Sequence, residues 1–441
     1  MYFSTNSLNH NKLLDTIDTL ETDEGKSNRM TKQLLSKINF KNIFHILSLL
    51  LAFAAPLSWK LSRLIMILLI VTKIIQFDFS TLWKTIKQSK LLIVFLIFTV
   101  YQLITLFWTE TSYQESHNFI RTYLLWFFAP VFVTMLNQES IKKLITYFLY
   151  GMAVSEVIAY GMYFGLWIVN GHGSDYPCPF MHHTSYSIFM SFTAIILLNR
   201  LYSSLYTIKE KMIMGIFFMT VSGNLFISQG RIGQLTFAVA ILVATILHFK
   251  LRIKTIFAAF FIISSIFFTA YQASPMFQQR LQMATQDISN ITQGNLNSSW
   301  GIRVAYLILG SHMIKDNLVF GVGLEDTKSE GLKYIQNNPY HFPKEVIDFM
   351  HCSYHFHNQY LMTTLQSGLV GLFLLLMLFY YLFTLPIKDP ELKRLSILFT
   401  VIFLIGSISD PFLMYEQTRV LFLLFTALFV ASSLQQKEER A

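Results

Sequence analysis

Long apolar runs alternate with short polar stretches along almost the whole chain. Twelve of these runs approach the ~20 apolar residues that an α-helix needs to cross a bilayer. The pattern therefore predicts an all-α polytopic membrane protein with about twelve transmembrane helices. The first two runs, and the seventh and eighth, are so close that each pair is either a helical hairpin or one broken helix. The runs are residues 42–59, 62–78, 91–108, 118–136, 145–169, 184–201, 212–228, 232–248, 255–272, 358–384, 395–409 and 412–433.

The composition agrees with this class and excludes others. Of 441 residues, 53% are hydrophobic and only 13% are charged, which is about half the ~25% of a soluble globular chain. A soluble enzyme, a disordered chain and a disulfide-stapled secreted domain are therefore excluded. Only two cysteines are present, so a Cys-based zinc or iron–sulfur site is excluded as well.

Basic residues fall on alternate loops. The net charge is +9, but the charge is not a nucleic-acid-binding patch, because each loop that follows an even-numbered run is basic. Such loops lie in the cytoplasm, and this also places both chain ends there. The basic residues concerned are Lys84, Lys87 and Lys90; Lys142 and Lys143; Arg200, Lys209 and Lys211; Lys250, Arg252 and Lys254; and Lys388, Lys393 and Arg394.

One connection is too long to be a simple link between spans. Residues 273–356 follow an odd-numbered run and therefore lie outside, and loops of this length usually carry function. Within this loop, Ile302 to Lys315 predicts a helix that ends at Asn317. The predicted organisation is a cytoplasmic tail (1–40), spans one to nine (41–272), a large periplasmic catalytic loop (273–356), spans ten to twelve (357–433) and a second cytoplasmic tail (434–441).

Histidines gather on the predicted outer side. The densest group contains His355, His357 and the adjacent Asn358, where the long loop re-enters the membrane. Histidine is suited to proton transfer near neutral pH. A metal site that also uses His182 and His183 is the alternative, but no carboxylate stands beside either pair, which disfavours it.

Two arginines stand out on the same side. Arg231 lies in the short turn Ser228-Gln-Gly-Arg231, where a membrane-boundary charge is a functional candidate. Arg303 begins the predicted loop helix. Two guanidiniums on one face can clamp a pyrophosphate in a bidentate manner. The alternatives are a snorkelling arginine at position 231 and a solvated one at 303.

Three motifs in order resemble the O-antigen ligase and polymerase superfamily of bacterial envelope glycosyltransferases, over roughly residues 220–375. The first is Ser228-Gln-Gly-Arg231. The second is Arg303-Val-Ala-Tyr-Leu with Met313-Ile-Lys-Asp316-Asn-Leu-Val-Phe-Gly321-Val-Gly323, and the third is His357-Asn358, nine residues, then Gly368-Leu-Val-Gly371.

The resemblance implies a GT-C-like fold in the bacterial inner membrane, with the active site facing the periplasm. It implies a metal-independent, inverting glycosyltransferase without a cofactor, which moves a glycan from undecaprenyl pyrophosphate to an acceptor sugar such as the lipid A-core. His357 would be the general base, Arg231 and Arg303 would hold the pyrophosphate, and Asn358 would orient His357 or cap span ten. His355, His182, His183 and Asp316 would be supporting or acceptor-binding residues, and Gly368 and Gly371 would allow close packing.

Other activities share parts of this pattern. An O-antigen polymerase must hold two anionic carriers and therefore needs a second set of outer arginines; Arg121, Arg419, Lys60 and Arg63 are the only candidates outside the long loop. This favours the ligase. A protein O-oligosaccharyltransferase has the same signature. A polysaccharide transporter should show charges deep in its spans and two similar halves, and the sequence shows neither.

The two cysteines both fall on the predicted outer side. Cys178 precedes His182-His183, and Cys352 precedes His357. A disulfide between them is chemically permitted in an oxidising envelope. Whether they form one or stay as free thiols depends on a distance that the sequence leaves open.

Overall fold

The structure is a computed structural model that describes residues 39–438, apart from 77, 111–116, 339–341, 343, 345–346, 349–350 and 352–354. Over this part of the chain the fold is helical, and its only extended feature is an isolated bridge between Val169 and His172. The predicted all-α class is confirmed. The predicted N-terminal tail lies almost entirely outside the described residues, and the predicted C-terminal tail begins inside the last helix.

Every predicted apolar run falls on helix. The first six runs correspond to α2 (Phe40–Ala54), α3 (Trp59–Ile75), α5 (Lys90–Ile104), α6 (His117–Leu124) with α7 (Phe128–Val133), α8 (Gln138–Tyr163) and α9 (His183–Tyr202). The short helix α4 (Phe79–Gln88) lies in the predicted basic loop between the second and third runs. Then follow α10 (Ile208–Ile227), α11 (Arg231–Phe249), α12 (Ile253–Ala273), α13 (Pro275–Thr292), α14 (Ser299–Asp316), α15 (Thr327–Asn337), α17 (Gln359–Phe383), α18 (Pro390–Gly406) and α19 (Glu416–Glu438).

Short polar side chains start many of these helices. An N-cap oxygen satisfies one of the backbone N–H groups that a helix end leaves open, which contributes about 1 kcal/mol. In α14, Ser298 accepts a hydrogen bond from the Gly301 N–H, so the helix begins three residues before the predicted start and ends at the predicted Asn317. The other caps of this kind are Asn39, Ser58, Asp78, Ser89, Asn137, Thr207, Ser274, Asn358 and Asp389.

Fewer than twelve helices are long and apolar enough to cross a bilayer alone. Among the described residues there are seven, or eight if α3 and α4, bent by 114°, are one broken span. The segments Phe40–Ala54 and Phe119–Val133 are apolar but short, and α18 has 17 residues. The count of twelve spans therefore stays a prediction.

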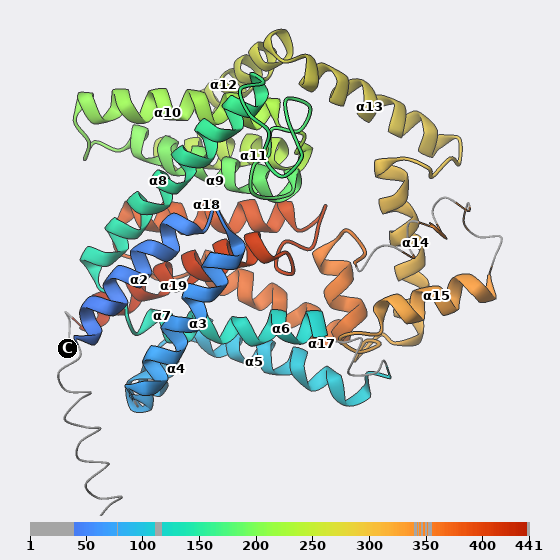
Figure 1. Ribbon diagram of the computed structural model, residues 1–441, viewed down its shortest axis with the longest axis horizontal. Helices are drawn as coiled ribbons and strands as arrows, with labels where there is room; N and C mark the ends of the chain where they lie inside the picture. The colour runs from blue at the N-terminus through green and yellow to red at the C-terminus, as the bar shows by residue number, and fades with distance from the viewer. Residues whose placement is uncertain are drawn as a thin grey trace, which may run out of the picture.

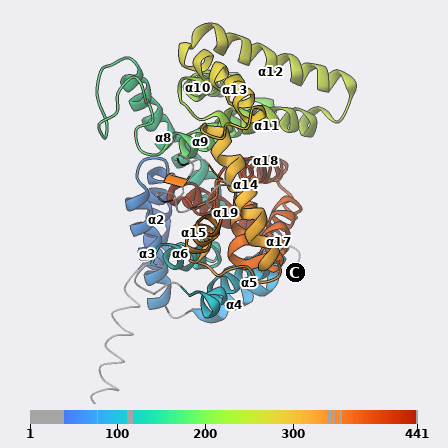
Figure 2. The same ribbon diagram turned by 90° about the vertical axis from the view of Figure 1, so that its right-hand side faces the viewer.

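The helices differ strongly in how deeply they are buried. Every residue of α9 from Thr184 to Asn199 is buried, and this helix lies among α8, α10, α11 and α18 (Figure 1). In α12 only Thr255 and Ala259 are buried, and the helix runs along the rim of the molecule (Figure 2). The serines and threonines of α9 are thus compatible with its central place, because protein and not lipid surrounds them.

The predicted long loop is largely helical. From the end of α12, α13 and α14 continue around one side of the molecule to α15, which lies beside α17 (Figure 1). Gly310 lets α14 approach α17 closely, since a Cβ there would meet the side chain of Leu361. The loop helices are therefore packed against the spans, and the second half of α14 is held near the start of α17.

Helix α17 is interrupted at Gly368. This glycine has a φ of +64°, which favours glycine, and a Cβ there would meet the carbonyl of Val319. The backbone on either side bonds to the chain after α14: Leu369 N–H donates to Leu318 O, and Val322 N–H donates to Leu365 O. The second and third sequence motifs therefore meet here, and the expected packing role of Gly368 fits this contact.

Two cavities lie in different parts of the molecule. One joins residues from 182–185, 299–303, 355–357 and 410–417, which belong to predicted outer loops or to the outer ends of predicted spans. The other joins residues from 87–91, 381–386 and 433–434, which belong to predicted inner loops or to the inner ends of predicted spans. We call them the outer and inner cavity. The grouping fits the alternation of basic loops, while the assignment of either side to the periplasm stays a prediction.

Candidate active site

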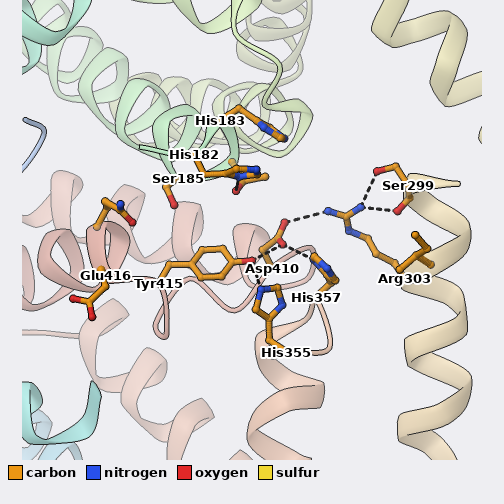
Figure 3. Close-up of a pocket in the computed structure, with 13 residues that line it drawn as sticks. His182, His183, Ser185, Ser299, Arg303, His355, His357, Asp410, Tyr415 and Glu416 are labelled. Atoms are coloured by element: carbon orange, nitrogen blue, oxygen red, sulfur yellow. Dashed lines mark hydrogen bonds and ion pairs between the residues drawn. The ribbon is translucent and has the colours of Figure 1, made fainter. Parts of the chain in front are cut away.

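The outer cavity collects histidines, an arginine and two carboxylates from four distant parts of the chain. Its volume is about 630 Å³, enough to receive a sugar-sized ligand. Figure 3 shows Asp410 in its centre, with His357, Arg303 and Tyr415 converging on it and with His182 and His183 across the opening. The lining residues are His182, His183, Thr184, Ser185, Ser299, Ile302, Arg303, His355, His357, Asp410, Tyr415, Glu416 and Gln417.

His357 is paired with a buried carboxylate. Its Nδ1 lies 2.9 Å from Oδ1 of Asp410. A carboxylate at Nδ1 favours the tautomer whose Nε2 accepts a proton, and it stabilises the imidazolium that forms. His357 also has a φ of +46°, a conformation that a non-glycine residue keeps only where its surroundings hold it. The pair has the form of a general base with its orienting acid.

Asp410 lies in the turn between α18 and α19 and is only 1% exposed. Burial by itself raises the pKa of this carboxyl, but the hydrogen bond with His357 and the charge of Arg303 outweigh burial and hold the pKa below its usual value. Arg303 reaches the other carboxylate oxygen, with Nη2 3.3 Å from Oδ2. Asp410 is therefore an anion at neutral pH that links the candidate base to an arginine.

His355 occupies a different electrostatic environment from His357. Burial, and then the neighbouring His357, lower the pKa of His355 to about 4. Its Nε2 lies 3.1 Å from the hydroxyl of Tyr415, and this hydroxyl donates a 3.0 Å hydrogen bond to Asp410. His355 thus stays neutral near pH 7, and its hydrogen bond links it to Asp410 through the hydroxyl of Tyr415.

Asn358 ties the His357 segment to the Asp410 turn. Its side-chain oxygen accepts a 2.9 Å hydrogen bond from the Leu361 N–H and so caps α17. Its side-chain nitrogen donates to the carbonyl of Ile408, also at 2.9 Å. Both roles expected for Asn358, the cap and the orientation of its neighbour, are compatible with this geometry.

Arg231 and Arg303 lie around one small recess. This arginine recess, of about 70 Å³, is lined by Arg231, Arg280 and Arg303 together with His183, Thr184, Gln229, Ile232, Ser299, Trp300 and Ser409. It shares His183, Thr184, Ser299 and Arg303 with the outer cavity. Three guanidiniums beside one opening, with no carboxylate among these lining residues, form an anion-binding surface.

Each arginine is held by neighbours. Arg231 pairs with Asp287 of α13 at 3.4 Å. Arg280, also of α13, donates to the side-chain oxygen of Gln229; burial, and then the charge of Arg231, lower its pKa. Arg303 donates to the carbonyl of Ser299 at 2.7 Å. The packing of α13 and α14 against the turn before α11 therefore brings the three positive guanidiniums close together. A bound anion would reduce the electrostatic repulsion among them.

The other predicted site residues divide into two groups. His182 and His183 line the outer cavity with ring centroids 4.0 Å apart, and burial lowers the pKa of His182. Asp316 does not line it: it is exposed at the far end of α14, thirteen residues or about 20 Å along the helix from Arg303. Among the described residues, no group of three or more His, Cys, Asp or Glu side chains is placed to hold a metal ion.

Sequence reasoning missed three residues of this site. These are Asp410, Tyr415 and Arg280, none of which lies in the motifs described above. A buried acid in the turn between the last two spans of an acid-poor chain is the signal that points to Asp410. Cys178 is buried, but Cys352 lies outside the described residues, so the question of a disulfide between the two falls outside what the structure describes.

Comparison with known proteins identifies part of the chain. Residues 216–376 match the family model described as O-antigen ligase. The match includes Arg231, Arg303 and His357, and it coincides with the region over which the sequence motifs resemble that superfamily; Asp410 and Tyr415 lie beyond it. No curated protein matches the chain.

Proposed function

We propose that this chain, which belongs to the O-antigen ligase family by the match of its residues 216–376, transfers a glycan from undecaprenyl pyrophosphate to an acceptor sugar hydroxyl. The reaction takes place at the outer face of a bacterial inner membrane, and the acceptor is the lipid A-core. The observation that carries the proposal is the position of Arg303, which lines both the outer cavity and the arginine recess and shares Asp410 with His357.

The acceptor hydroxyl reacts at His357. Its oxygen attacks the anomeric carbon of the donor glycan while Nε2 of His357 takes the hydroxyl proton, and Asp410 stabilises the resulting imidazolium. The bond between the anomeric carbon and the pyrophosphate oxygen breaks with both electrons going to oxygen. A single displacement of this kind inverts the anomeric configuration. General-base catalysis of this kind contributes about 10²–10⁴-fold.

The leaving undecaprenyl pyrophosphate gains negative charge as the bond breaks. Arg231 and Arg303, joined by Arg280, offset this charge in the arginine recess. Because these arginines already offset the charge of the leaving pyrophosphate, the reaction does not need a divalent ion for this purpose. We therefore propose a metal-independent reaction without a cofactor. His182, His183 and Ser185, across the cavity from His357, line the space for the acceptor sugar.

The remaining outer arginines favour a ligase over a polymerase. Arg419 is 1% exposed and bonds to Thr122 and to the carbonyl of Met414, so it stabilises the fold. Arg63 and Arg419 both pair with Glu416. Arg63, Arg419 and the exposed Arg121 do not line the arginine recess, whereas a polymerase needs to hold a second pyrophosphate carrier.

The surface polysaccharide of a deletion strain tests the proposal. A ligase deficiency leaves a bare lipid core while polymer accumulates on undecaprenyl pyrophosphate, and wild-type chain restores the capped core whereas H357A does not. Single repeat units on the core instead indicate a polymerase. An unchanged lipopolysaccharide, with loss of glycan from envelope proteins, indicates a protein O-oligosaccharyltransferase.

A further inference from the structure

The inner cavity lies where α4 meets α5 and where α17 and α19 end. Its volume is about 430 Å³. The polar residues that line it are Lys87, Gln88, Ser89, Lys90, Tyr381, Thr384 and Ser433. The cavity belongs to none of the machinery described above, because it draws on different segments of the chain, all predicted to lie on the opposite side of the membrane.

This cavity is positively charged. Lys87 and Lys90 are both exposed and line it, and no acidic side chain is among its described lining residues. The first turn of α5, which carries the positive end of the helix dipole, borders it through Ser89, Lys90 and Leu91. The last turn of α4, which carries the negative end of that helix's dipole, borders the same cavity at Gln88, so the two ammonium groups supply the net attraction for an anion.

Two carbonyl groups at the end of α17 and just after it already accept hydrogen bonds from a lysine. The end of α17 would otherwise present oxygens to the cavity, which would repel an anion. Instead, the ammonium of Lys393 accounts for two of them, since it donates to the carbonyl of Phe383 at 3.0 Å and to that of Leu385 at 2.7 Å. The wall formed by α17 is thus neutralised by a third lysine.

Helix α4 places exposed aromatic side chains beside these lysines. Phe79 and Trp83 are 55% and 58% exposed, and with Lys87 they are spaced by four residues, which puts all three on one face. The Lys87 ammonium lies 5.0 Å from the centroid of the Trp83 ring. α4 turns away from α3 by 114° (Figure 1). A short helix with exposed aromatics and lysines is typical of the membrane interface.

We propose that the inner cavity binds the headgroup of an anionic phospholipid. Lys87 and Lys90 hold the phosphate, and Trp83 and Phe79 lie against the start of the acyl chains. Basic cavities between membrane helices are known to favour anionic headgroups. The site differs from an ordinary basic loop because its lysines border a cavity and stand next to exposed aromatics. It is independent of the glycan transfer proposed above.

Lipid binding to the full-length chain in detergent tests this assignment. Native mass spectrometry with added phosphatidylglycerol or phosphatidylcholine compares a charged with a zwitterionic headgroup. We expect wild type to retain phosphatidylglycerol preferentially. K87Q/K90Q should bind it at least roughly tenfold more weakly, because a basic side chain near an anionic headgroup contributes about 1 kcal/mol. A second variant, T384W, keeps both lysines and places a bulky side chain in the cavity, and should also bind it more weakly than wild type.

A matched control uses lysines outside the cavity. Lys209 and Lys254 are exposed and lie on other predicted inner loops, so K209Q/K254Q should bind phosphatidylglycerol like wild type. Equal retention of both lipids by wild type would overturn the assignment, as would an equal loss in K209Q/K254Q or wild-type binding by T384W. The melting temperature of each variant distinguishes lost binding from lost folding.

Discussion

The outer and inner cavities both contain basic residues, but in opposite arrangements. In the outer cavity, Arg303 and His357 contact the two oxygens of one buried carboxylate, that of Asp410. In the inner cavity, Lys87 and Lys90 are exposed and have no acidic neighbour among the lining residues described. Fixed, mutually oriented charges suit catalysis, whereas exposed ammonium groups suit a ligand that carries its own countercharge.

The difference shows that the number of basic residues in a loop says little about their role. Arginine fixes two hydrogen-bond directions at once, and the three arginines of the recess border a site built from α11, α13 and α14. Lysine is a point charge on a flexible chain. The experiments below test whether the outer cavity depends on such fixed geometry.

The largest effect is expected at His357. H357A should lower glycan transfer by at least ~10²-fold, because the acceptor hydroxyl loses its general base. The measurement is transfer by purified chain with a lipid-linked donor. H172A is the matched control, since His172 is exposed and does not line the outer cavity. Full activity of H357A together with an inactive H355A would move the base to His355.

A smaller but clear loss is expected when arginine geometry changes at constant charge. R231K and R303K should each transfer at least about tenfold more slowly, because an ammonium cannot reproduce the bidentate contact with pyrophosphate, and hydrogen bonds to charged groups contribute about 1.5–3 kcal/mol. R252K, at an exposed arginine of a predicted inner loop, should transfer like wild type. If lysine serves equally well at positions 231 and 303, general positive charge suffices and the contrast between the cavities disappears.

The buried histidines predict a pH dependence of stability. In the folded chain the pKa of His355 is lowered to about 4 from its ordinary value of 6.5, so the side chain stays neutral until the pH falls to about 4. The unfolded chain therefore takes up the proton first, and stability is lost as the pH falls from about 6.5 to 4, by up to about 3 kcal/mol. H355N should show a smaller fall in melting temperature between pH 7 and pH 5 than wild type. An identical fall in both proteins would contradict the buried, neutral His355.

The smallest effect is expected from removal of metal. Transfer in EDTA should equal transfer in buffer, because the arginine recess already supplies the positive charge. The comparison requires the purified chain, with and without chelator, at saturating donor. Inactivation that a divalent ion reverses would revive the metal alternative, and His182, His183, His355 and His357 would be the ligands to substitute.

Much of the fold could be predicted from the apolar pattern. All twelve runs fall on helix, and α14 ends at Asn317 as its sequence indicates. The pattern could not show that α17 is interrupted at Gly368, since that break depends on a hydrogen-bonded contact with the chain after α14. It also could not separate α9, which protein surrounds, from α12, whose surface is largely exposed.

The candidate site was predicted where its residues lie in recognisable motifs and missed where tertiary packing supplies them. Arg231, Arg303 and His357 are brought together around connected spaces. Asp410 and Arg280 come from segments without a motif, and only packing places them beside these residues. Asp316 shows the opposite case, since it lies on the same helix as Arg303 but at its far end.

The most direct test of the account is a single turnover of donor and acceptor by the purified chain in EDTA, with the product linkage analysed. We predict one undecaprenyl pyrophosphate released for each glycan transferred and an inverted anomeric configuration, with neither product formed by H357A. Retention of configuration, or transfer by H357A at the wild-type rate, would contradict a single displacement by an acceptor that His357 activates in the outer cavity.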